Sequence, residues 1–303
     1  NTGALLGEEN SGVSGRTLHS NWSSAAGGQV SGKDIVIFGG GDGFCYGLDT
    51  KTTLKGNFEV MDELWRFDCN PATYRKDKTG KPIKYATFNG PSEVIATPVL
   101  YKEKVYVPIG QDPEHGEGLG SLVCIDPSKR GNLQKTGLVW RYDKIHRSLS
   151  TPSIVGNLMF VADFSGFIHC VDVTTGKPYW VFDSKSHIWA STLVADGKLY
   201  VGTEDGDVIV LAATKQMKEL GRYDMRAPVY STSVAANGTL YVATPTHLYA
   251  IGKSKTAQAP VDHKSAAAKA QLARMETNAA KARAEHREVT ACLVDGRSAV
   301  KED

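Results

Sequence analysis

The chain has 303 residues, of which 41% are hydrophobic and 22% charged, and its formal net charge is +2. This length is sufficient to bury a large core, and the nearly balanced charge, with Lys and Arg scattered except in the tail, argues against a nucleic-acid partner and an anionic membrane surface. No apolar run approaches the roughly 20 residues that a membrane-spanning helix requires, so we expect no membrane span.

The chain begins with a turn that recurs later in the sequence. Thr2-Gly3 matches Thr175-Gly176, which lies inside a repeated four-strand pattern. We therefore expect residue 1 to follow a truncation or a processed end, with earlier repeats missing. Any secretory signal would be lost with them, so its absence is uninformative.

Five copies of one pattern follow, each starting with a segment expected to be a first strand. These segments are Asn21–Ser24, Val94–Pro98, Ser148–Pro152, Ile188–Thr192 and Val229–Ser233. A turn comes next, and three of the five turns carry Gly flanked by Asn or Asp, which is a hairpin signal. The second strands are expected at Ile35–Phe38, Val105–Val107, Met159–Val161, Leu199–Val201 and Leu240–Val242.

The spacing of the copies is close to that of one propeller blade. Third strands end at Asp49, Asp126, Asp172, Ala213 and Gly252. From Thr151 to Ser191 to Thr232 the periods are 40 and 41 residues, and four-stranded blades repeat at about 40–45. The first two copies are longer, with the surplus between Asp49 and Pro91 and within Gln111–Gly120. We interpret both as loop insertions, where function usually resides.

The third copy carries the clearest motif, in which a strand ending at Asp172 leads through Thr175-Gly176-Lys177 to Trp180. This pattern resembles the repeat of β-propellers named after pyrroloquinoline quinone (PQQ) dehydrogenases. The resemblance implies that each copy is a four-stranded blade and that the Thr-Gly turn and the Trp staple neighbouring blades. We therefore expect an all-β propeller of four-stranded antiparallel blades, with about five blades or part-blades present. The fifth copy ends without a Trp-bearing fourth strand.

The composition changes after the fifth copy and predicts two domains. Residues 1–253 are expected to form the PQQ-like propeller, incomplete at its N-terminus. Residues 254–303 form a tail rich in Ala, Lys and Arg. Ala266–Glu288 is rich in helix formers but has few apolar positions, so the tail is expected to be helical or disordered. A partner-binding helix is the alternative.

Polar residues just before the first strands are expected to meet at one mouth of the central channel. When the copies are aligned on their Ser or Thr, Glu93, Arg147 and His187 fall at one level, and His19 and His146 fall one residue earlier. We predict that these five side chains bind a small polar or anionic ligand. The alternative is an ordinary solvated rim.

A second candidate site is the acidic stretch within Gln111–Gly118. Its weak candidates for metal ligands are Asp112, Glu114, His115 and Glu117, since carboxylates suit Ca²⁺ or Mg²⁺ and His adds affinity for transition metals. The spacing matches no established metal motif, and a glycine-rich loop with solvated acids is the alternative. We assign no metal.

Cysteine and tryptophan are expected to serve packing. The five Cys form neither a disulfide framework nor a C-x-x-C pair, and we expect small buried side chains. Trp65, Trp140 and Trp180 lie at or near the stapling position of the family, and Trp22 and Trp189 precede the channel strands. Structural packing accounts for all five.

The resemblance leaves several functions open. We favour a non-catalytic scaffold that binds a protein partner, as do repeat proteins of outer-membrane assembly, with a small polar ligand possible in the channel. The alternative is a fragment of a PQQ- and calcium-dependent alcohol or sugar dehydrogenase, and a third candidate is a sugar- or metal-binding sensor. The sequence lacks the adjacent Cys-Cys pair of those dehydrogenases, so we assign no catalytic residue and no cofactor. By resemblance, the compartment is periplasmic or extracellular.

Overall fold

The computed structural model describes residues 5, 7–84, 87, 90–111 and 113–252. Contacts divide the chain into two units, Asn1–Ala250 and Ile251–Asp303. The expected tail, residues 254–303, lies outside the described residues. Among the residues that are described, no helix is long and apolar enough to cross a membrane.

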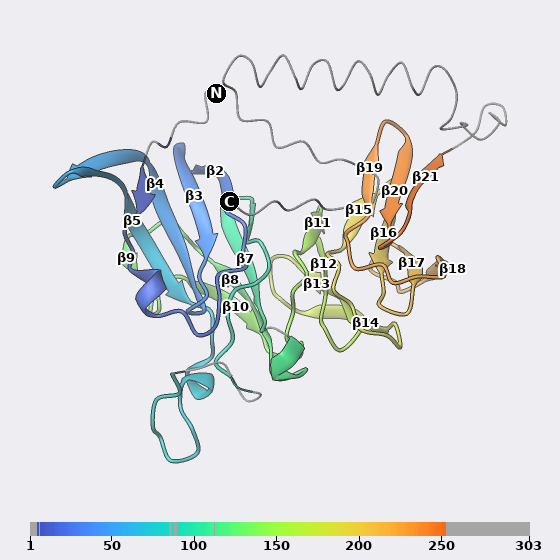
Figure 1. The fold of residues 1–303 in the computed structure, drawn as a ribbon, viewed down its shortest axis with the longest axis horizontal. Coiled ribbons are helices and arrows are strands. Elements are labelled where there is room, and N and C mark those ends of the chain that lie inside the picture. Colours follow the sequence, from blue (N-terminus) through green and yellow to red (C-terminus); the bar gives the residue numbers. More distant parts are fainter. Residues whose placement is uncertain (1–4, 6, 85–86, 88–89, 112, 253–303) are drawn as a thin grey trace, which may run out of the picture. The chain divides into compact units, whose positions relative to one another are not determined.

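The strands of the described residues form five sheets that follow one another along the chain (Figure 1). We number these sheets as blades 1 to 5. Blade 1 has the order β1-β5-β4-β3-β2, with β9 added beside β5. Its strands are β1 (Glu8–Glu9), β2 (Ala26–Val30), β3 (Lys33–Gly39), β4 (Phe44–Lys55), β5 (Phe58–Asp68) and β9 (Gly131–Asn132).

Blades 2 to 4 are four-stranded antiparallel sheets, and blade 5 has three strands in the described residues. Blade 2 contains β6 (Val99–Tyr101), β7 (Lys104–Ile109), β8 (Ser121–Ile125) and β10 (Leu138–Tyr142). Blade 3 contains β11 (Ser153–Val155), β12 (Leu158–Ala162), β13 (Phe167–Asp172) and β14 (Pro178–Asp183). Blade 4 contains β15 (Leu193–Ala195), β16 (Lys198–Gly202), β17 (Asp207–Ala212) and β18 (Glu219–Asp224), and blade 5 contains β19 (Val234–Ala236), β20 (Thr239–Ala243) and β21 (Leu248–Gly252). The expected all-β fold of four-stranded antiparallel sheets is confirmed.

The expected first strands are displaced along the chain. Strands β6, β11, β15 and β19 begin directly after the expected segments, and β2 begins two residues after Ser24. The backbone of the expected segments bonds to neighbouring blades instead of to its own sheet. Ser148 N–H donates to Ile109 O at 3.0 Å, and Val229 N–H donates to Thr203 O at 2.9 Å. Extended, β-prone residues therefore form connections between blades here.

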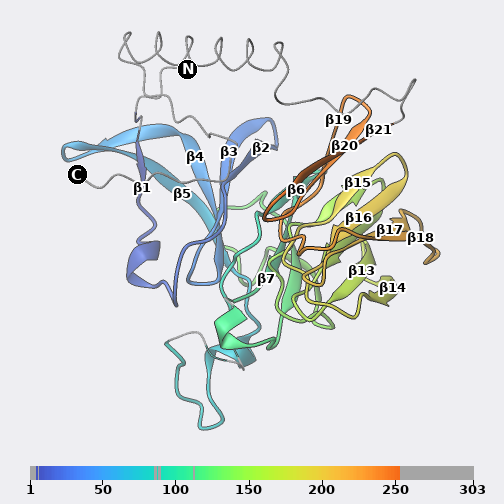
Figure 2. The same ribbon diagram turned by 45° about the vertical axis from the view of Figure 1, so that its right-hand side comes forward.

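Part of the expected insertion after Asp49 is regular strand. β4 and β5 pair beyond the repeat as a long hairpin, in which Thr52 pairs with Met61 and Lys55 with Phe58 (Figure 2). The remaining surplus includes the short 3₁₀ helix η2 (Ala72–Arg75), and 3₁₀ helix η3 (Pro113–His115) lies in the second insertion.

The core lies between adjacent sheets. Tyr106 and Leu122 of blade 2 cluster with Met159 and Val171 of blade 3, and Phe160 of blade 3 belongs to the next cluster, shared with blade 4. Because the side chains of a strand alternate between the two faces of its sheet, each of these clusters is formed by one face from each of two adjacent sheets. Burial between blades therefore holds the sheets in series.

The four described cysteines belong to this core, as expected. Cys45, Cys69, Cys124 and Cys170 are at most 1% exposed and form no disulfide. Burial raises the pKa of the Cys170 thiol to about 12, so it is not a reactive thiolate at neutral pH.

Hydroxyl groups join successive blades at one level. Thr97 N–H donates to Thr151 Oγ1 at 3.1 Å, and Thr151 N–H donates to Ser191 Oγ at 2.9 Å. Ser191 N–H donates in turn to Thr232 Oγ1 at 2.9 Å. These residues are the ones on which the copies align, so the alignment is confirmed at this level. We call this series the hydroxyl ladder.

Tryptophans join the blades at their outer edge. The indole N–H of Trp140 on β10 donates to Val173 O of blade 3 at 2.9 Å. Gly176 adopts φ +70°, and a Cβ there would lie 2.6 Å from the Trp140 ring, so only glycine fits under it. Trp180 makes the equivalent bond to Thr214 O of blade 4, also at 2.9 Å. The staple that the resemblance implied is therefore present. Trp22 is different, since it is 51% exposed and does not pack in the core.

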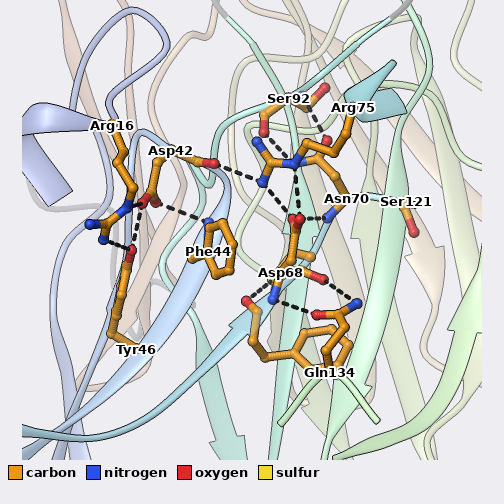
Figure 3. Close-up of polar contacts among 12 residues, drawn as sticks. Arg16, Asp42, Phe44, Tyr46, Asp68, Asn70, Arg75, Ser92, Ser121 and Gln134 are labelled. Carbon is orange, nitrogen blue, oxygen red and sulfur yellow. Dashed lines mark hydrogen bonds and ion pairs between the residues drawn. The ribbon is translucent and has the colours of Figure 1, made fainter. Parts of the chain in front are cut away.

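The segment before β2 covers the outer face of blade 1. Val13, in 3₁₀ helix η1 (Val13–Gly15), is buried with Tyr46 and Leu48. Arg16 donates to Asp42 Oδ2 at 3.1 Å and to Tyr46 Oη at 2.7 Å (Figure 3). β1 adds to β5 in parallel. The expectation that the chain opens within a blade concerns mainly residues 1–4 and 6, which lie outside the described residues.

A second polar network ties the insertion after β5 to the second turn of blade 1. Arg75 binds Asp68 through Nε at 2.9 Å and donates to the carbonyl of Asp42 at 2.8 Å (Figure 3). Asn70 and Ser92 exchange two hydrogen bonds of 2.7 Å each. Ser92 directly precedes the candidate Glu93, so this network holds the chain at that candidate.

The hydroxyl ladder can be tested by removing one acceptor. Ser191→Ala leaves the Thr151 N–H without its partner, and we expect a loss of about 1 kcal/mol in the free energy of unfolding, as for one net hydrogen bond. Hydrogen exchange should show faster exchange of the Thr151 amide. Ser231→Ala is the control, because Ser231 is exposed and its hydroxyl makes only a 3.4 Å contact. Unchanged exchange at Thr151 would contradict the proposed role of the ladder.

Candidate functional site

In blades 3 and 4, the segment before the first strand contacts the turn between the second and third strands. In blade 3, Phe164 N–H of the turn donates to Arg147 O of the segment at 2.8 Å. In blade 4, Glu204 N–H of the turn donates to His187 O at 2.9 Å. These bonds hold the two segments together at one end of each of these blades, which we call the mouth.

Arg147 is buried and holds the backbone beside the mouth through hydrogen bonds. Its side chain is fully buried, and its guanidinium donates to the carbonyls of His115 at 2.9 Å and of Thr87. Gly118 lies against it, since a Cβ there would be 2.2 Å from the guanidinium. Burial lowers the pKa of Arg147 to about 10, so it remains charged at neutral pH. Arg147 thus anchors the second insertion and does not present its charge to a ligand.

Glu93 and His19 also make internal contacts. Glu93 is fully buried, and its Oε1 accepts the backbone N–H groups of His19 and Ser20, each at 2.7 Å. The His19 ring lies edge-on to His115 at 5.2 Å. This carboxylate therefore holds the segment before β2 against blade 2.

His187 joins residues of two blades at the surface. Its Nε2 lies 3.1 Å from Glu117 Oε1 in the second insertion, and its Nδ1 lies 3.2 Å from Glu204 Oε2 of blade 4. Ser165 Oγ donates to the other oxygen of Glu117 at 3.1 Å. The side chains of His187, Glu117 and Glu204 are 43%, 54% and 35% exposed. This bridge is therefore held in place and still reachable from solvent.

The pKa values of His187 and Glu117 are shifted in opposite directions by their contact. The hydrogen bond to Glu117 raises the pKa of His187 above 6.5, partial burial opposes this, and Glu204 adds to the rise. A histidine whose pKa is raised by folding stabilises the folded state when it is protonated. This contribution is fully present below the pKa of the unfolded state and is lost as pH rises through the pKa of the folded state. The bond from His187, followed by that from Ser165, lowers the pKa of Glu117 below 4.5. The contribution of Glu117 to stability is present above pH 4.5 and is lost as pH falls through the pKa that Glu117 has in the folded state.

Aromatic rings surround this bridge. Phe164 stacks on the His187 ring at 4.5 Å with an interplanar angle of 3°. Trp189 meets Phe164 edge-on at 5.2 Å and Tyr230 at 5.8 Å, and its indole N–H donates to Glu204 Oε2 at 3.3 Å. We call these residues the aromatic–acidic mouth: Glu117, Phe164, His187, Trp189, Glu204 and Tyr230.

His146 belongs to a separate relay beside the mouth. Its Nδ1 lies 3.2 Å from Asp163 Oδ2, an oxygen that is also 3.0 Å from His169 Nε2. His169 Nδ1 lies 3.0 Å from Tyr142 Oη. Burial, followed by the charge of Asp163, raises the pKa of Tyr142 to about 12, so Tyr142 is a neutral phenol here. The relay is buried except at His146, which is 49% exposed.

The structure divides the predicted site residues into groups. His19 and Arg147 contact His115, and Glu93 binds the backbone N–H of His19. His146 contacts Asp163, whereas His187 pairs with Glu117. Glu114 is exposed on η3, and Asp112 lies outside the described residues. The sequence reasoning missed Asp163, Glu204 and Phe164, all in second turns. Since second turns lie at the same end of a blade as the segments before first strands, aligning both positions is the signal that finds them.

The candidate metal ligands do not assemble into a metal site in the described part of the chain. No group of three or more His, Cys, Asp or Glu side chains there is placed to hold a metal ion. Glu117 and Glu204 are bound to His187, and Glu93 binds backbone N–H groups. These three carboxylates are therefore engaged by groups of the protein itself.

The chain is similar to parts of several known proteins. The chain is 30% identical over 95 residues to the 1-butanol dehydrogenase (cytochrome c) of Thauera butanivorans, covering 27% of this chain and 14% of that protein. BamB of Moraxella catarrhalis matches with a TM-score of 0.49 and 14% identity, covering 77% of this chain and 61% of that one. Quinohemoprotein alcohol dehydrogenase ADHIIG of Pseudomonas putida HK5 matches with a TM-score of 0.40 and 15% identity, covering 60% and 30%. The chain spans less than two thirds of each of these proteins.

Family membership comes from the sequence of the repeats. The matched repeats define the chain as a β-propeller protein of the PQQ-like class. More narrowly, the family described as outer membrane protein assembly factor BamB matches residues 120–297, more than half of the chain. The chain belongs to this BamB-type family of PQQ-like repeat proteins.

The bridge predicts how His187 titrates. Glu117→Gln removes the hydrogen bond that is the largest single cause of the raised pKa, so the pKa of His187 should fall toward 6.5. NMR titration of the imidazole Cε1–H signal measures this directly. Glu219→Gln, on β18 and paired with Arg222, is the matched control and should leave the titration unchanged. An unaltered His187 titration in Glu117→Gln would refute the bridge.

Proposed function

We propose that this chain is a non-catalytic PQQ-like propeller that serves as a binding scaffold, with a protein partner docking at the aromatic–acidic mouth. The observation that carries this proposal is the His187 bridge, in which exposed ionisable groups from different blades are held at fixed distances. Rigid sheets that present such groups on loops suit recognition. The name of the matched family, an assembly factor, supports a role in binding proteins.

The proposal includes a compartment and a domain division. We infer a periplasmic or extracellular location, since the family description refers to outer-membrane assembly. We also propose that residues 1–253 form the propeller domain and residues 254–303 a separate tail. A small polar ligand in the central channel remains part of the proposal.

The second candidate is a PQQ- and calcium-dependent dehydrogenase fragment. The 95-residue similarity to a 1-butanol dehydrogenase favours it. The lack of adjacent cysteines in the sequence counts against it. We therefore place it second.

Cofactor loading separates the two candidates. The full chain is incubated with PQQ and Ca²⁺, and after desalting its absorption spectrum and dye-linked oxidation of 1-butanol are measured. We expect no retained quinone spectrum and no oxidation above the protein-free rate. A stoichiometric quinone spectrum with dye reduction would overturn the scaffold proposal.

Partner binding is tested with a mouth variant. His187→Ala combined with Trp189→Ala removes the bridge and its central ring while leaving the hydroxyl ladder intact. Chemical cross-linking in a periplasmic extract should give adducts with the parent chain that the double variant lacks. Phe58→Ala, a change of an exposed aromatic residue at the tip of the β4–β5 hairpin, should keep them. Identical adducts in all three chains would exclude the mouth as the docking site.

A further inference from the structure

The aromatic–acidic mouth has a charge that its own histidine only partly balances. Glu117 and Glu204 both contact His187, and these two carboxylates are the charged groups that act on its titration. From the neighbouring segment, His146 acts on Glu117. Above the pKa of His187, two exposed carboxylates therefore flank a neutral imidazole. This local negative charge contrasts with the formal net charge of +2 of the whole chain.

Aromatic faces lie within reach of the same carboxylates. Trp189 is bonded to Glu204, and Tyr230, which is 44% exposed, lies beside Trp189. A cation placed over an aromatic face is attracted by the quadrupole of the ring, and nearby carboxylates add to the attraction. A negatively charged ligand would meet repulsion at both acids.

A series of partly exposed apolar side chains, one in each copy, offers contacts for more of a ligand than a single cation. Two residues before each aligned Ser or Thr, every copy has one large apolar side chain that is not fully buried. In blades 2 to 4 the residues on either side of it are buried, as Ile188 and Ala190 are around Trp189. The side chains in this series are Trp22, Ile95, Leu149, Trp189 and Tyr230. Such side chains can pack against the aliphatic stems of Lys and Arg in an extended peptide, and against the residues next to them.

Resting on the proposed scaffold function, we propose that the aromatic–acidic mouth binds a basic polypeptide segment of the partner. A Lys or Arg side chain takes Glu117 and Glu204 as its counter-ions in place of His187, with Trp189 and Tyr230 as its aromatic walls. His187 is then an internal competitor for the same carboxylates. A metal ion is the poorer occupant, because the described residues present no three-ligand group.

The test uses the full chain and two synthetic probes, hexalysine and hexaglutamate, at constant ionic strength. Binding is followed by isothermal titration calorimetry at pH 8 and at pH 5.5. We expect hexalysine to bind at pH 8 and to bind about tenfold more weakly at pH 5.5, where protonated His187 occupies the carboxylates. Hexaglutamate should not bind at pH 8.

Three variants assign this binding to the mouth. Glu117→Gln with Glu204→Gln should weaken hexalysine binding at pH 8 by at least about tenfold. His187→Gln, which cannot become cationic, should remove the difference between pH 8 and pH 5.5. Glu219→Gln, a carboxylate change on β18, should bind like the parent chain. Circular dichroism melting checks that each variant is folded.

The outcomes separate this inference from the proposed function. Equal binding of hexalysine to the parent chain and the Glu117/Glu204 variant, or no binding at all, would overturn the basic-segment inference. The scaffold proposal would still stand if the His187/Trp189 variant lost its cross-linked partner. Loss of hexalysine binding in the Glu117/Glu204 variant, with the pH dependence removed in His187→Gln, supports the inference.

Discussion

The structure depends on the hydroxyl ladder, in which a Ser or Thr of one blade accepts the backbone N–H of the blade before it. Each bond contributes modestly, since a net hydrogen bond is worth about 1 kcal/mol. The ladder nevertheless satisfies N–H groups in segments that belong to no sheet, from Thr97 through Thr151 and Ser191 to Thr232. At the outer edge, Trp140 and Trp180 donate to the next blade. Inner and outer bonds together leave adjacent sheets little freedom to rotate.

This constraint explains why comparing repeats predicted the fold so well. The periods of 40 and 41 residues come from residues that bond directly to one another in the ladder, so the alignment has a physical basis. The same backbone role explains the main error in the strands. A segment such as Ser148–Pro152 is extended and β-prone, but its Ser148 and Thr151 N–H groups bond to other blades. Composition cannot distinguish this from a strand.

The site was less predictable than the fold. Alignment placed His187 at the mouth, but it could not show that Arg147 is buried, because that burial comes from the second insertion folding over it. Insertions have no repeat to align with. Glu204 was missed because only the segment before each first strand was compared. Trp22 and Trp189 occupy equivalent positions, yet Trp22 is the more exposed of the two, since packing depends on neighbours that differ between blades.

The asymmetry of the mouth follows from one insertion on a regular frame. Arg147 holds the second insertion through the carbonyls of His115 and Gly116, and this places Glu117 beside His187. The repeat alone would supply only Glu204, because the equivalent turn position in blade 3 is the apolar Phe164. A second carboxylate must therefore come from outside the repeat, and the insertion delivers it across blade 3. The regular repeats thus fix the distance between the blades, and the insertion determines which charged groups lie at the mouth.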